Sequence, residues 1–202
     1  MTGFDFVFAL FSLLLGLAMA EVLGGFASVM KLHARASAGM AKDVRVGWLV
    51  PLLATFVLLS QLTFWTQAYS IRDQLPFNYV TLLVVTAIVG GYYLLSVLVW
   101  PDEPADWPDF DAYYDQHNRF ILTGNLALTL VAAVVTGIFA PDRPATADGP
   151  LVIAAVVGVY GALALNIWLI FVRARQLNIL LLALLIVLQV GGSVALVAAG
   201  IR

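Results

Sequence analysis

The sequence predicts an all-α integral membrane protein, a single domain over residues 1–202 built as a polytopic bundle of six transmembrane helices. Three observations support this fold class. Hydrophobic residues make up 62% of the 202-residue chain and charged residues only 11%, and the mean hydropathy is +0.98. The apolar residues also gather in six stretches, each long enough to cross a bilayer core of about 30 Å. Little sequence remains outside these stretches, so any function lies in the bundle or at its two surfaces.

The first predicted span covers residues 4–30 and carries two unusual features. Small side chains recur every fourth residue and form a ridge on which another backbone packs closely; the ridge residues are Ser12, Gly16, Ala20, Gly24 and Ser28. Glu21 is the only charged residue deep inside any span. Gly24 and Ser28 lie within about 60° of it around the helix axis, so we expect the carboxyl to face a packed neighbour.

A carboxyl at membrane depth costs roughly 2.5–3.5 kcal/mol on insertion scales, so it indicates either a functional group or a well-satisfied hydrogen bond. In the functional interpretation, Glu21 binds a proton or a cation. In the structural interpretation, it stays protonated and donates a hydrogen bond to an amide. The sequence leaves both open.

The second predicted span, residues 46–69, is the most polar one. Thr63, Thr66, Gln67 and Ser70 share one helix face at i, i+3, i+4 and i+7 spacing. They either line a wet groove that opens outward or hold neighbouring helices together by hydrogen bonds. The third predicted span, residues 80–100, is almost wholly apolar and ends at Trp100, a residue type that favours the membrane surface.

The last three predicted spans cover residues 120–140, 151–172 and 179–199. Asn125 and Asn166 each belong to a row of small or polar residues at i+4 spacing, and Gln189 precedes a pair of glycines. A buried carboxyl needs hydrogen-bond partners. The amides at a depth similar to that of Glu21 are Gln61, Asn125, Asn166 and Gln189, and the sequence does not select among them.

The orientation follows from the basic residues, because Lys and Arg near span ends favour the cytoplasmic side. Seven lie in the first, third and fifth connections, whereas three lie elsewhere. This distribution predicts a plasma (inner) membrane protein with both termini on the outer side. The seven are Lys31, Arg35, Lys42, Arg45, Arg119, Arg173 and Arg175, and the three are Arg72, Arg143 and Arg202.

The third connection, residues 101–119, is predominantly acidic and is predicted to begin a helix near Pro108. Three interpretations compete for its polar residues, Asp109, Asp111, Asp115 and His117. In the first, the carboxylates attract cations to a pore mouth. In the second, Asp111, Asp115 and His117 bind a metal. In the third, the acids remain solvated and pair with the basic first connection. The spacing matches no established metal signature, so the sequence predicts no metal site.

Several function classes are excluded. The chain has no cysteine, which rules out disulfides and thiolate chemistry. Its net charge of −2 and the lack of a basic tail argue against nucleic acid as a partner. No zinc-protease, nucleophile-elbow or phosphate-loop motif is present, so we expect neither an enzyme nor a cofactor.

Two functional hypotheses remain. The first is a small, homo-oligomeric channel or transporter for protons or monovalent cations, with its site formed by Glu21, Asn125, Asn166, Gln189, Gln61, Thr63 and Gln67. The second is a non-catalytic membrane subunit that docks partner helices on the ridge and recruits or senses a cytoplasmic protein. A purified transporter acts alone in lipid, whereas a subunit co-purifies with its partner.

Overall fold

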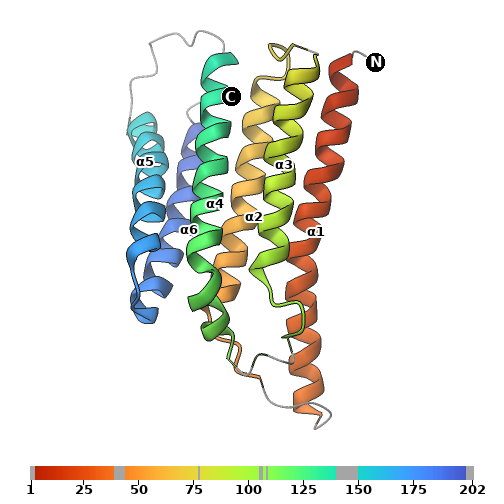
Figure 1. Ribbon diagram of the computed structural model, residues 1–202. Helices are drawn as coiled ribbons and strands as arrows, with labels where there is room; N and C mark the ends of the chain where they lie inside the picture. The colour runs from red at the N-terminus through yellow and green to blue at the C-terminus, as the bar shows by residue number, and fades with distance from the viewer. Residues whose placement is uncertain are drawn as a thin grey trace.

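The computed structural model describes residues 3–38, 44–76, 78–104, 107, 109–139 and 150–198. These residues form six α-helices and no β-strand (Figure 1). All six helices are long and apolar enough to cross a membrane, which supports a multi-pass membrane protein. The helices are α1 (Gly3–Ser37), α2 (Leu49–Ser70), α3 (Tyr79–Val99), α4 (Phe110–Phe139), α5 (Pro150–Phe171) and α6 (Arg175–Ala198).

The helices alternate in direction along the bundle. As drawn in Figure 1, α1, α3 and α5 run from the upper to the lower end, and α2, α4 and α6 return. The lower end is therefore the one that the basic residues predict to be cytoplasmic, although Lys42, Arg143 and Arg202 lie outside the described residues. The orientation remains a prediction.

The bundle has α1 on one side and α5 on the opposite side (Figure 1). The first helix packs on α3 and α2, whereas α5 packs on α6 and α4. Because α2 contacts α1, α3, α4 and α6, it is the central helix. This position is consistent with the polar side chains of α2, because Ser60 and Gln61 are buried against other helices.

The inner face of α1 is formed by its larger apolar residues. Phe11, Leu15, Ala18 and Val22 are buried and recur at helical spacing along one side. Trp100, just after α3, fixes the lower part of this face, because its indole N–H donates to the carbonyl oxygen of Val22 at 3.1 Å. The helix continues to Ser37, well past the predicted limit at residue 30.

The acidic connection after α3 folds back on the bundle. As predicted, a helix begins just after Pro108, and it continues without interruption into the fourth apolar segment as α4. The hydroxyl of Tyr113 lies within hydrogen-bond distance of the carbonyl oxygens of Leu98 (2.8 Å) and Trp100 (3.1 Å). Carbonyls at a helix end have no partner inside the helix. Tyr113 of α4 therefore supplies a hydrogen-bond donor to the carbonyl oxygens at the end of α3.

The backbones of α5 and α6 approach each other most closely at two glycines. A Cβ atom added to Gly158 would lie 2.7 Å from the Cα of Gly192 and 3.1 Å from the carbonyl oxygen of Leu188. No side chain separates the two helices at this point. Gly158, one of the small residues in the row predicted for the fifth span, therefore packs against α6.

Candidate functional site

A cavity of about 130 Å³ lies among α2, α4, α5 and α6, and its wall combines eight polar residues with ten apolar or glycine residues; we call it the polar cavity after the former. Five of the residues proposed from sequence as a transport site line it, together with three further polar residues. Polar lining residues are Ser60, Thr63, Gln67, Asn125, Thr129, Asn166, Gln189 and Ser193. Ser60 lies halfway along α2.

Side-chain hydrogen bonds across the cavity join three helices. The Oγ of Ser60 accepts from Asn125 Nδ2 at 3.2 Å and from Gln189 Nε2 at 3.4 Å. Gln189 Nε2 also lies 3.2 Å from Thr63 Oγ1. Both hydroxyls donate their own protons to carbonyl oxygens one turn earlier in α2. The amide N–H groups are therefore the donors in this network, and the hydroxyl oxygens are the acceptors.

The amide oxygens that line the cavity are left without donors. Asn125 Oδ1, Asn166 Oδ1 and Gln189 Oε1 are buried and have no hydrogen-bond partner among the described residues. Only 1% of Asn125 and 4% of Asn166 are exposed. An unsatisfied buried acceptor costs about 1–3 kcal/mol, so a group of three indicates a site for a donor or a cation.

Gln61 faces a different neighbour. It is completely buried on the side of α2 that packs on α3, and its Nε2 donates to Ser96 Oγ at 2.6 Å. Gln61 does not line the cavity. Its geometry is that of an interhelical hydrogen bond that holds α2 to α3.

Glu21 lies apart from all four amides, and this differs from the expected packing. The side chain is exposed on α1 and makes no hydrogen bond or ion pair with the described residues. A Cβ added to Gly16 or Gly24 would meet no atom within 4 Å, so most of the small-residue ridge also faces outward. The reason is that α1 packs on its neighbours with the apolar face that contains Val22. Glu21 lies about 100° away from Val22 around the helix axis.

The two ends of the ridge behave differently. Ala20 and Ser28 are exposed with the glycines, whereas Ser12 is half-buried and accepts from the indole N–H of Trp65 at 3.5 Å. The neighbouring Gly25, which is not part of the ridge, packs against the ring of Trp100. The described part of the chain therefore covers only the upper end of the ridge.

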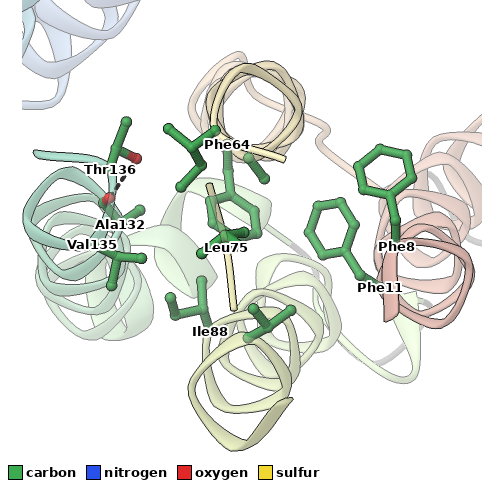
Figure 2. A pocket seen from close by; sticks show the side chains of 11 residues that line it. Phe8, Phe11, Phe64, Leu75, Ile88, Ala132, Val135 and Thr136 are labelled. Carbon is green, nitrogen blue, oxygen red and sulfur yellow. Dashed lines mark hydrogen bonds between the residues drawn. The ribbon is translucent and has the colours of Figure 1, made fainter. Parts of the chain in front are cut away.

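A second pocket, between α1, α2, α3 and α4, is apolar. Figure 2 shows Phe8 and Phe11 on one side of it and Ala132 and Thr136 on the other. The hydroxyl of Thr136 donates to the carbonyl oxygen of Ala132 at 2.7 Å, so it has no proton to donate to a ligand. With a volume of about 30 Å³ and this lining, the gap is a packing defect and not a binding site.

The acidic connection has two carboxylates in ion pairs. Arg175, the first residue of α6, contacts Asp109 Oδ2 at 3.2 Å and Asp115 Oδ2 at 2.7 Å. Among the described residues the ion-pair partner is thus Arg175, while the first connection meets this stretch through the backbone, where Arg45 bridges Asp109 and its carbonyl oxygen accepts from the Phe110 N–H. The ion pairs join the start of α4 to α6 at the lower end. A single guanidinium offsets only one of the three carboxylate charges proposed for a pore mouth.

The other two residues of this group point to other partners. Asp111 is buried, and its carboxylate packs against Gly47. His117 stacks on Tyr113 with ring centroids 4.1 Å apart, and its Nδ1 lies 3.0 Å from the Tyr113 carbonyl oxygen. Within the described ranges, no three His, Asp or Glu side chains gather as a metal site would require.

Replacing Arg175 with glutamine is expected to lower the free energy of unfolding by less than about 1 kcal/mol, because all three partners are partly exposed. Thermal unfolding of the purified protein in detergent measures the change at low and at high ionic strength. The difference between native and variant should shrink with salt. A large difference that salt does not reduce would contradict an electrostatic role.

No protein-family model matches the chain, and neither a curated protein nor a solved structure gave a significant match. The function is therefore inferred from the geometry of the cavity and of the α1 surface.

Proposed function

We propose that the chain is a small membrane channel or transporter for monovalent cations, with the polar cavity as its binding site. The observation that carries this proposal is the group of three unpaired amide oxygens, from Asn125, Asn166 and Gln189. Oxygens of this kind replace the hydration shell of a cation in selective pores. Their position among α2, α4, α5 and α6 is where bundles and transporters hold small ligands.

The lining favours monovalent over divalent cations. No carboxylate among the described residues lines the cavity, and Ca²⁺ and Mg²⁺ are bound mainly through carboxylates. Four hydroxyls of the lining, those of Ser60, Thr63, Thr129 and Ser193, already donate within their own helices, so they present lone pairs to the cavity. A monovalent ion needs only such neutral oxygens. Transport of this kind requires no chemical reaction, which fits the lack of an enzyme motif.

The test measures Na⁺ and K⁺ flux into liposomes that contain the purified protein, under an imposed membrane potential. Native protein should conduct at least one of the two ions. Asn166→Leu is nearly isosteric and removes one unpaired oxygen, so flux should fall about fivefold, which corresponds to about 1 kcal/mol of lost ion binding. The thermal midpoint should not fall, because Asn166 donates no hydrogen bond that the structure records.

Thr136→Val is the matched control. Thr136 lies outside the polar cavity and bonds only within α4, so this variant should keep native flux. Absence of flux from folded native protein would contradict the transport proposal. Loss of flux in Glu21→Gln, with Asn166→Leu unaffected, would move the site from the cavity to the surface of α1.

A second function is supported by a separate observation, the exposed face of α1. We propose as the alternative that the chain is a non-catalytic subunit whose small-residue ridge docks a helix of a partner membrane protein. Gly16 and Gly24 have open space in front of them, and small residues at this spacing allow helices in membranes to approach closely. A docked helix would also shield Glu21, which is costly to expose to lipid.

Cysteine cross-linking tests this alternative, because the chain has no cysteine of its own. Gly24→Cys, reacted with a bifunctional thiol-to-amine reagent in native membranes, should give an adduct larger than the 21.8 kDa chain. The control is Val157→Cys, on the exposed surface of α5, which should give little adduct. An adduct of twice the chain mass would show a homo-oligomer and contradict a dedicated partner subunit, as would no adduct.

A further inference from the structure

A polar groove lies at the lower end of the bundle, between α4 and the turn that joins α5 to α6. Its volume is about 460 Å³. It is separate from the polar cavity and shares no lining residue with it. The groove is lined by Asp115, Gln116, Asn118 and Arg119 of α4, by Val172 and Arg173 of the turn, and by Asn178 of α6.

Two guanidinium groups of the groove have no counter-ion. The carboxylate of Asp115 is held by Arg175, whose Nε and Nη2 donate to it at 2.9 and 2.7 Å. Arg119 and Arg173 are both exposed and form no ion pair in the part of the chain that the structure describes. A guanidinium presents a planar fork of donors that matches a phosphate, so these two arginines fit a phosphate group.

The groove also contains acceptors that lack donors. Asn118 is 5% exposed and Asn178 is fully buried. The Oδ1 atom of each has no hydrogen-bond partner among the described residues. An ionised phosphate cannot satisfy them, since it only accepts hydrogen bonds. An occupant that matches both features therefore carries a phosphate and, close to it, an N–H or O–H donor.

Exposed apolar side chains lie beside the groove in the sequence. Phe120 follows Arg119 on α4 and is 65% exposed, and Phe171 at the end of α5 is 73% exposed. Trp168, one turn earlier in α5, is also exposed, and tryptophan is enriched where a membrane meets water. A ligand whose phosphate lies in the groove would thus have apolar surface available for hydrocarbon chains.

We infer that this groove binds the headgroup of a glycerophospholipid, with its phosphate on Arg119 and Arg173 and a donor of the head on Asn118 and Asn178. Ethanolamine and glycerol heads carry N–H or O–H donors, whereas the quaternary ammonium of choline carries none. The groove therefore selects phosphatidylethanolamine and phosphatidylglycerol over phosphatidylcholine. Basic pockets between helices at a membrane surface hold lipid heads in this way.

Native mass spectrometry of the delipidated full-length protein, incubated with each lipid in detergent, tests the inference. The dissociation constant for phosphatidylglycerol and for phosphatidylethanolamine should be about tenfold below that for phosphatidylcholine, the factor that one hydrogen bond to a buried acceptor supplies. Arg119→Gln/Arg173→Gln removes the phosphate contacts that all three lipids share, so it should weaken the binding of each about tenfold. Asn118→Leu removes an acceptor for the head and should reduce the preference itself. The matched control, Lys31→Gln/Arg35→Gln, removes two charges from the exposed lower part of α1 and should leave both the affinities and the preference intact.

Several results would overturn the inference. Equal affinity for the three lipids would show that the groove does not distinguish the headgroups, and an unchanged affinity in the arginine double variant would show that the phosphate does not bind there. Competition by inorganic phosphate alone at the same concentration as lipid would indicate a free-anion site. If the double variant does not fold, the single variant Arg173→Gln, which alters only an exposed residue of the turn, should reduce the affinity for each lipid by a factor of about three.

Discussion

Replacing Gly158 with leucine is expected to destabilise the bundle by about 3 kcal/mol, because overpacked side chains force helices apart. The glycine has the backbone of α6 directly in front of it: an added Cβ would lie 2.7 Å from Gly192 Cα. Backbone cannot rotate away as a side chain does, so α5 would shift as a whole. Thermal unfolding in detergent and size-exclusion chromatography report the loss.

The matched control for this prediction is Gly191→Leu. Gly191 is exposed, and a Cβ at this position meets no atom within 4 Å. Both substitutions put the same side chain in place of a helical glycine, so their difference isolates the close approach of α5 and α6. Equal midpoints for the two variants would show that the helices do not pack at Gly158.

Filling the polar cavity with a phenyl ring should reduce cation flux more than tenfold. Ala162 lines the cavity and lies one turn before Asn166 on α5. Ala162→Phe adds a ring, and an engineered protein cavity of about 150 Å³ holds a benzene molecule. The ring would therefore occupy most of the space in front of the unpaired oxygens. Flux into liposomes, measured as above, reports the effect.

The control for the filling experiment lies two residues away. Ala164 is exposed on α5 and does not line the cavity, so Ala164→Phe should keep native flux. Both variants should retain native elution and helical content. A folded Ala162→Phe protein that conducts at the native rate would contradict the cavity as the ion site, whatever its stability.

The helical framework was predictable because it depends on local properties. Six apolar stretches gave six helices. The fourth helix begins near Pro108, as predicted, and its residues Phe110, Tyr113 and Tyr114, which precede the apolar segment, are buried. Periodicity of this kind survives in one sequence because each helix buries a continuous face.

The candidate site was only partly predictable. Asn125, Asn166 and Gln189 were identifiable as deep amides, but the hydrogen bonds of Asn125 and Gln189 to Ser60 depend on which helices are neighbours. The face of α1 that packs inside the bundle was harder to predict. A small-residue ridge packs equally well within a chain or against another chain, and only the three-dimensional arrangement shows that Val22 and Trp100 meet while Glu21 does not. No sequence pattern predicted the polar groove at the lower end, since Arg119 and Arg173 are far apart in the sequence.

The ion pairs of Arg175 with Asp109 and Asp115 have a consequence for the rest of α6. Arg175 and Gln189 belong to one uninterrupted helix, 14 residues or about 21 Å apart at 1.5 Å per residue. A helix is stiff over this length, so we expect a tilt of its lower end to move Gln189 relative to Ser60 and Thr63. Hydrogen bonds tolerate displacements of only a few tenths of an ångström. A displacement at the ionic end of α6 is therefore expected to reach the hydrogen bonds of Gln189 near its centre.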